Sequence, residues 1–340
     1  MTLVFTGFDS IDPTADIAAQ VPELVMVNDA SISVVGGRNN DGQALQTTNG
    51  AYLEYGLLGL SHNRTVSMGA SFKYTNAASN NILIQVCNAE SPLISSNHEA
   101  GYSQPPAVLY VKDGFLWVSL SSGLTERLIA FADNERAYIE LRFFWEPGNY
   151  TGQSSYIYVN GLKVFDLGCL RYIGNTKRTV VYLALAPSNM QIDIDDVYIE
   201  TYDTKGSVIP VLASGKISSL ALTTDSNTFS VVGTSADAAL SDNSDATYIN
   251  STQSAEAVFS VDKNNVPDIY ALQLSARAKS STSGVTTFSL EDSASADICP
   301  ESTIGFTDTL SNYTLPSVSS SNSSTITNKI KSGATLRIKT

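Results

Sequence analysis

The chain is poor in charge and in the residues that build common catalytic or metal sites. Asp, Glu, Lys and Arg make up 16% of its 340 residues, and it has two histidines and three cysteines. His62 and His98 lie in polar contexts without the spacing of a zinc site, and neither accompanies a Gly-x-Ser-x-Gly elbow. A phosphate-binding Gly-x-x-x-x-Gly-Lys-Ser/Thr loop is missing too. Zinc, nucleotide and Ser/His/Asp chemistry are therefore not indicated.

Positive charge and long apolar runs are also scarce. Twenty basic residues stand against 33 acidic ones, which gives a net charge of −13, and no basic cluster offsets it locally. Such a surface repels nucleic-acid backbones and anionic lipid. No run approaches the roughly 20 apolar residues of a membrane span, and the opening residues lack the pattern of an export signal. We expect neither nucleic acid nor a membrane among the partners.

The three cysteines, Cys87, Cys169 and Cys299, are odd in number and far apart. This excludes the disulfide framework of a small secreted domain. We expect buried free thiols.

Strand periodicity dominates what is present. Alternating and short apolar runs bounded by Gly, Asn, Asp or Pro recur, while windows with helical spacing are few. The pairs Asn160-Gly161 and Asp113-Gly114 each stand between two β-forming runs and predict hairpins with type I′ turns. Strands are expected at residues 65–74, 81–87, 107–111, 115–120, 137–144, 156–159, 162–167 and 179–184. The sequence predicts an all-β protein.

A change in composition divides the chain. After Tyr202 the residues become smaller and richer in Ser, Thr and Ala, and both tryptophans are left behind. We therefore expect a β-sandwich over residues 1–205 and a second, smaller, jelly-roll-like β-sandwich over residues 206–340. The Ser-rich run at 317–325 is expected to be a long loop before a last strand, ATLRIK.

Five segments follow one another in the first part. They are GQALQTTNGAYLEYGL from Gly42, then TVSMGASFKY, AYIELRFFW, IYVNGLKVFDL and IDIDDVYIE. In this order they resemble a concanavalin A-like, laminin-G-like domain, over about residues 1–203. The second part contains AALSDNSDATYINS at 238–251. The combination resembles virion proteins of tailed bacteriophages, which implies a protein of the virion that is assembled in the host bacterial cytoplasm.

The segment QIDIDDVYIE, residues 191–200, is acidic for a strand. Strict alternation would leave neither of its faces apolar, whereas a β-bulge at Asp195-Asp196 would turn all four of its aliphatic residues inward. We predict this bulge, with Asp193 and Glu200 facing water.

The carboxylates at the bulge are candidate metal ligands. Asp195 and Asp196, together with Asp9, offer hard oxygen ligands for a structural Ca²⁺, and the family resembled often carries calcium near this strand. The alternative is that Asp9 or Asp196 accepts hydrogen bonds from backbone amides in a turn. No other cofactor is expected.

No catalytic residue is predicted. Retaining sugar hydrolases of this fold carry a Glu-x-Asp-x-x-Glu pattern that places two carboxyl groups about 5 to 5.5 Å apart. The nearest stretch, DIDDVYIE, lacks the first Glu and is expected on the closing strand instead of the concave sheet. We therefore expect a protein that is not an enzyme.

Aromatic rings in loops offer a candidate glycan site, because such rings stack on sugar faces. The candidates are Tyr150, Trp145 and Tyr172. The first hypothesis is nevertheless a non-enzymatic structural component of a tailed-phage virion, a tail, neck, fibre or capsid-decoration subunit that contacts other virion proteins and forms a homo-oligomer. The alternative is a carbohydrate-binding adhesin that recognises a host surface glycan. A polysaccharide hydrolase is the least favoured reading.

Overall fold

The structure is a computed structural model in which the chain forms two compact units. The first unit comprises residues 1–9 and 21–217, and the second comprises residues 10–20 and 218–340. The sequence placed the division at residues 205 and 206. The structure describes residues 2–8, 11, 13–14, 16–21, 24–38, 42–58, 64–75, 81–87, 107–120, 123–146, 155–168, 170–171, 178–186, 190–202, 220–241, 246–264, 266, 268–280, 284–315, 318–319 and 323–340.

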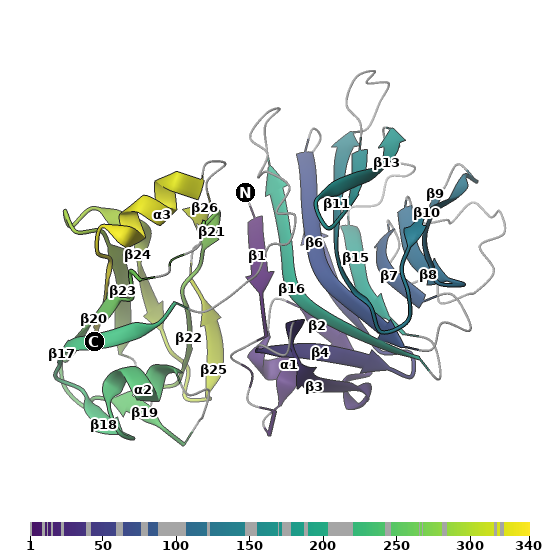
Figure 1. Ribbon diagram of the computed structural model, residues 1–340. Helices are drawn as coiled ribbons and strands as arrows, with labels where there is room; N and C mark the ends of the chain where they lie inside the picture. The colour runs from purple at the N-terminus through teal and green to yellow at the C-terminus, as the bar shows by residue number, and fades with distance from the viewer. Residues whose placement is uncertain are drawn as a thin grey trace. The chain divides into compact units, whose positions relative to one another are not determined.

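Two antiparallel sheets make up the described part of the first unit, and both are visible in Figure 1. The nine-stranded sheet follows the path β13 (Leu162–Gly168), β12 (Ser155–Val159), β11 (Arg136–Glu146), β6 (Arg64–Thr75), β16 (Gln191–Tyr202), β4 (Gln43–Thr48) and β3 (Ile32–Gly36), with β1 (Thr2–Thr6) on β16 and the short parallel β14 (Leu170–Arg171) on β11. The seven-stranded sheet follows the path β10 (Thr125–Ala130), β9 (Phe115–Leu120), β8 (Ala107–Lys112), β7 (Asn81–Cys87), β15 (Arg178–Leu185), β5 (Tyr52–Leu58) and β2 (Val25–Val27). A 3-10 turn, η1 (Asp29–Ser31), precedes β3.

The strands and hairpins expected in the first part are confirmed. Each of the eight ranges lies on one of the strands β6 to β9, β11 to β13 and β15. Asn160 and Gly161 have φ values of 49° and 80°, and Asp113 and Gly114 have 51° and 75°. Two consecutive positive φ values are what a type I′ turn requires, so the chain turns back on itself at both places.

One face of the nine-stranded sheet is apolar. On β6 the side chains of Val66, Met68, Ala70, Phe72 and Tyr74 are at most 1% exposed. They alternate along the strand, and the partners of Met68, Phe72 and Tyr74 on β11 and β16 are aliphatic residues that are also buried. This face forms part of the core of the first unit. The side chains on the opposite face of the same strands are not part of this core.

The second unit is also rich in strands. Its five-stranded sheet follows the path β17 (Leu222–Asn227), β20 (Glu256–Val261), β27 (Thr335–Lys339), β23 (Val285–Glu291) and β24 (Asp297–Gly305). Three strand pairs accompany it: β18 (Ser230–Val232) with β19 (Tyr248–Asn250), β21 (Ala271–Leu272) with β26 (Val318–Ser319), and β22 (Ser275–Ala278) with β25 (Ser311–Thr314). Its helices are α1 (Ile17–Gln20), α2 (Ala236–Ser241) and α3 (Ser323–Lys331). The all-β fold class expected from the sequence is confirmed.

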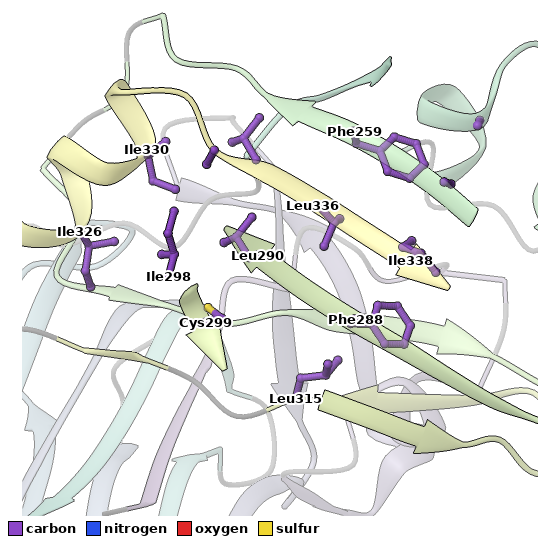
Figure 2. Close-up of a cluster of buried hydrophobic side chains, with 14 of the residues drawn as sticks. Phe259, Phe288, Leu290, Ile298, Cys299, Leu315, Ile326, Ile330, Leu336 and Ile338 are labelled. Carbon is purple, nitrogen blue, oxygen red and sulfur yellow. The ribbon is translucent and has the colours of Figure 1, made fainter. Parts of the chain in front are cut away.

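The core of the second unit gathers side chains from the sheet and from α3 (Figure 2). Phe259, Phe288 and Leu290 point from the sheet toward this core, and Ile326 and Ile330 of α3 pack against it. Cys299 is a buried free thiol in the same core. Burial raises the pKa of this thiol to about 11, so it stays protonated and unreactive. The thiols of Cys87 and Cys169 lie outside the described residues.

The helix α3 corrects one expectation. The Ser-rich run was expected to be a loop as far as residue 325, but helix begins at Ser323. Ile326 and Ile330 are four residues apart, so both fall on one face of the helix, and they are 3% and 0% exposed. Burial of this pair outweighs the weak helix propensity of the surrounding Ser, Thr and Asn residues.

No helix among the described residues is long and apolar enough to cross a membrane.

Candidate functional site

The face of the nine-stranded sheet that lies opposite the core is strongly polar. We call it the polar face. It consists of Ser67, Gly69, Ser71 and Lys73 on β6, Arg136, Tyr138, Glu140 and Arg142 on β11, and Asp193, Asp195, Tyr198 and Glu200 on β16. These three strands lie side by side near the middle of the sheet (Figure 1). Buried polar groups are costly unless they are paired, so their partners define the site.

Glu140, Gly69 and Tyr198 lie opposite one another on the three strands. The Tyr198 ring occupies the space that a side chain at Gly69 would fill, and its hydroxyl donates a hydrogen bond of 2.8 Å to Glu140 Oε1. Glu140 has no exposed surface, and Tyr198 is 3% exposed. Burial and the nearby Glu140 carboxylate raise the pKa of Tyr198 well above its usual value. Tyr198 therefore keeps its proton and holds it against a carboxylate.

The bulge predicted at Asp195-Asp196 is confirmed. Asp195 pairs with Ser71 and Tyr198 pairs with Gly69, so that two residues of β16 face one residue of β6. Asp196 has a φ of 50°, in the left-handed region. The four aliphatic residues of the segment point inward as expected, and they are at most 1% exposed: Ile192, Ile194, Val197 and Ile199.

Arg38 closes the bulge from the end of β3. Its backbone N–H donates to Asp195 Oδ2 at 3.0 Å, and its guanidinium Nη1 lies 3.3 Å from Asp196 Oδ2. The second oxygen of Asp195 accepts a hydrogen bond of 2.7 Å from the backbone N–H of Asp196. Burial is the main cause that raises the pKa of Asp195 to about 7, and the neighbouring Asp196 carboxylate is the second. The two amide hydrogen bonds lower the pKa and so oppose this shift. Asp195 therefore exchanges a proton near neutral pH.

Asp193, two residues before Asp195 on β16, has three donor groups around its carboxylate. Its Oδ2 lies 3.4 Å from Lys73 Nζ and 3.8 Å from Arg136 Nη2, and its Oδ1 accepts a hydrogen bond of 2.8 Å from Gln46 Nε2. Two cations thus share one carboxylate oxygen. Lys73 is about one third exposed, so this end of the polar face reaches solvent.

One expectation about the acidic segment is wrong. Asp193 and Glu200 were expected to face water, but they are 6% and 0% exposed. The segment forms β16, the last described strand of the first unit in chain order, and it lies inside the sheet between β6 on one side and β4 with β1 on the other. Because the strand has neighbours on both sides, its carboxylates meet partners across the sheet.

The residues proposed for glycan binding are not brought together by the described structure. Tyr150 and Tyr172 lie outside the described residues. Trp145 is on β11, with its backbone opposite Arg64 and Leu170, and its side chain lies outside the described part.

The calcium prediction stays untested. Asp9 lies outside the described residues, as do His62 and His98. Among the residues that are described, no group of three or more His, Cys, Asp and Glu side chains could hold a metal ion. The turn alternative expected Asp9 or Asp196 to accept hydrogen bonds from backbone amides. Asp195 accepts two such hydrogen bonds, whereas Asp196 accepts one from the Arg38 guanidinium.

The raised pKa of Asp195 predicts how stability changes with pH. Its ordinary pKa is 3.8 and its folded-state pKa is about 7, so between these values the folded protein holds a proton that the unfolded chain has lost. Stability contributed by this group is therefore complete below about pH 4 and falls as pH rises to about 7, by at most about 1.4 kcal/mol per unit. Asp195→Asn should remove this slope.

Urea unfolding from about pH 4 to about pH 8 measures the effect. Relative to Asp195→Asn, the wild type should lose stability as pH rises through this range. Glu126→Gln on β10, where the carboxylate is exposed, serves as the control. Parallel curves for wild type and Asp195→Asn would contradict the assignment.

Comparisons with known proteins come from solved structures. No protein-family model matches the chain, and no curated protein matches it. The endo-beta-1,4-glucuronan lyase of the fungus Trichoderma reesei is 12% identical, with a TM-score of 0.34, over 49% of this chain and 85% of the lyase. A mutant of the alginate lyase Aly36B in complex with alginate trisaccharide is 10% identical, with a TM-score of 0.40, over 59% of this chain and 98% of the lyase. A carbohydrate esterase of the Shiga toxin-encoding bacteriophage phi24B is 13% identical, with a TM-score of 0.39, over 57% of this chain and 96% of the esterase.

These matches correct two expectations from the sequence. The similar structures are carbohydrate-active enzymes, so the non-enzymatic structural virion subunit and the expectation that the chain is not an enzyme are both wrong. At identities of 10 to 13% the likeness concerns the fold alone, and a function has to be argued from the side chains of the polar face.

Proposed function

We propose that the protein is an enzyme that cleaves glycosidic bonds of a polysaccharide on the polar face. The observation that carries the proposal is the row Glu140, Gly69 and Tyr198, in which a buried tyrosine hydroxyl donates to a carboxylate at 2.8 Å. Cleavage of a glycosidic bond needs one group that gives a proton to the leaving oxygen and one that takes a proton from water or from the sugar. Tyr198 and Glu140 are such a pair.

Asp195 supports the proposal independently. Proton transfer is most efficient when the pKa of the transferring group lies near the working pH, and the pKa of Asp195 is raised to about 7. Its neighbour across the sheet is Ser71, one row from the Glu140 row. Perturbed carboxylates that share one face with other ionisable groups are typical of functional sites.

The proposal places a requirement on substrate binding. Glu140 has no exposed surface, so a sugar reaches it only after the groups that cover it have moved. Closure over a bound sugar would in turn exclude water and strengthen the electrostatic contacts. Arg142, whose guanidinium lies 5.6 Å from the centre of the Tyr158 ring, stands beside Glu140 on the same face and is half-buried.

Incubation of the full chain with a panel of bacterial and plant polysaccharides tests the proposal. New reducing ends indicate cleavage, and ultraviolet absorbance of an unsaturated product separates elimination from hydrolysis. Tyr198→Phe should lower the rate by about 10²- to 10⁴-fold, because it removes the hydroxyl that would give a proton to the leaving oxygen. Tyr248→Phe, on an exposed ring of the second unit, is the matched control. Activity that persists at the wild-type rate in Tyr198→Phe would refute the assignment.

We also propose that the protein is carried on a phage particle. Its support is the resemblance of residues 238–251, in the second part of the chain, to virion proteins of tailed bacteriophages. An enzyme carried there would degrade the polysaccharide of a host surface. Mass spectrometry of purified particles checks whether the chain is part of them.

A further inference from the structure

Arg136 Nη1 and Ser71 Oγ are buried polar atoms of the polar face, and neither has a hydrogen-bond partner in the part of the chain that the structure describes. Ser71 is 1% exposed, and the Arg136 side chain is 15% exposed. A buried donor without a partner costs about 1–3 kcal/mol, so native proteins rarely keep one without a reason. Two on the same face, on neighbouring strands, indicate a position that a ligand completes.

Charge around Arg136 points to the kind of ligand. Arg136 and Lys73 both pair with Asp193 Oδ2, while the other oxygen of Asp193 is taken by Gln46. One carboxylate therefore pairs directly with two positive charges, while the Asp195 carboxyl group, whose pKa the Arg136 charge lowers, lies nearby without an ion pair to Arg136 among the described residues. A further anion can bind here without displacing Asp193, because Arg136 still has an unused N–H group.

We infer that this end of the polar face binds the anionic substituent of an acidic polysaccharide, a carboxylate or a sulfate ester, with Arg136 and Lys73 as its ligands. The inference rests on the proposed function and extends it from the bond that is cleaved to the class of substrate. A guanidinium matches both anions because its N–H groups form a planar fork. Ser71 Oγ supplies a hydroxyl for the same sugar.

The distance along the sheet separates this subsite from the proton-transfer pair. Lys73 and Gly69 are four residues apart on β6, which corresponds to about 13 Å. This is longer than one sugar ring. The anionic group therefore belongs to a different sugar of the same polymer from the one whose bond is cleaved, and Arg136 and Lys73 set specificity without taking part in the reaction.

Binding is measured apart from cleavage with the Glu140→Gln protein. Affinity electrophoresis against polygalacturonate, carrageenan and a neutral glucan compares a carboxylated, a sulfated and an uncharged polymer. We expect retention by an acidic polymer, and at least tenfold weaker retention when Arg136→Met or Lys73→Met is added. Arg127→Met, at an exposed position on β10, is the matched control and should leave retention unchanged.

Two variants keep the result interpretable. Lys73 is more exposed than Arg136, so Lys73→Met tests the subsite even where the loss of Arg136 lowers the melting temperature. Retention by the neutral polymer alone, retention by none of the three, or unchanged retention of both variants would overturn the inference.

The two proposals fail in different ways. A wild-type protein that cleaves only neutral polysaccharide keeps the proposed function and loses this subsite. Tight, Arg136-dependent retention by an acidic polymer that is never cleaved keeps the subsite and loses the proposed reaction.

Discussion

Gly69→Ala should abolish activity and destabilise the first unit at the same time. A methyl group at this position would lie 2.5 Å from Tyr198 Cε1 and 2.9 Å from Glu140 Cγ, closer than carbon atoms can approach. The φ of Gly69 is ordinary, so the cost comes from side chains and not from the backbone. Overpacking costs about 1–3 kcal/mol, and a Glu140 carboxylate parted from its donor adds about as much. Thermal unfolding measures the loss of stability, and the polysaccharide assay measures the loss of rate.

The sheet provides a matched control for this substitution. Gly36 ends β3 in the same sheet, and a methyl group there would meet nothing within 4 Å. Gly36→Ala should therefore leave both stability and rate close to wild type. Gly69→Ala with Tyr198→Leu should recover part of the stability but none of the activity, because the clash is relieved while the hydroxyl is lost. Full activity in Gly69→Ala alone would show that the Glu140–Tyr198 contact is not needed.

Local signals in the sequence predicted the parts of the fold that depend on a few neighbouring residues. Asn160-Gly161 and Asp113-Gly114 predicted both hairpins, because positive φ values at both turn positions are a property of the dipeptide itself. The bulge was predictable for a similar reason, since only an extra residue at Asp195-Asp196 gives the segment one apolar face.

The burial of the polar face could not be predicted from such local signals. Asp193 and Glu200 alternate with aliphatic residues, a pattern that equally describes a strand with one side in water. Their burial depends on partners distant in sequence, since Gln46 is 147 residues from Asp193. A catalytic pattern such as Glu-x-Asp-x-x-Glu lies on a single strand, whereas Glu140 and Tyr198 belong to different strands and are 58 residues apart.

One signal for this site was present in the sequence. Gly69 interrupts TVSMGASFKY, and a glycine inside a strand often marks a close approach by another group. On the strand that pairs with it, Tyr138, Glu140 and Arg142 alternate with apolar residues, so one face of β11 is ionisable or phenolic from Arg136 to Arg142. Together these two features indicate the position where the Tyr198 ring lies over Gly69 and its hydroxyl reaches Glu140.

Glu140→Gln should separate a catalytic role of the carboxylate from a structural one. The amide has nearly the same shape, and its carbonyl can still accept the hydrogen bond from Tyr198, so the fold should be kept. A proton acceptor is lost, and the rate should fall by about 10²- to 10⁴-fold. Steady-state rates measured beside the melting temperature test this, with Glu126→Gln on β10 as the exposed control.

Glu140→Ala completes the comparison. It removes the acceptor altogether and leaves the Tyr198 hydroxyl with only Ser67 Oγ, 3.2 Å away, in a fully buried position. Stability should fall by about 1–3 kcal/mol beyond that of Glu140→Gln, because a buried group loses its partner and the space is not refilled. If Glu140→Gln retained the full rate while Glu140→Ala lost it, the carboxylate would serve only to hold Tyr198 in place. A loss of rate in both variants, with stability lost only in Glu140→Ala, is the result that a proton-transferring carboxylate requires.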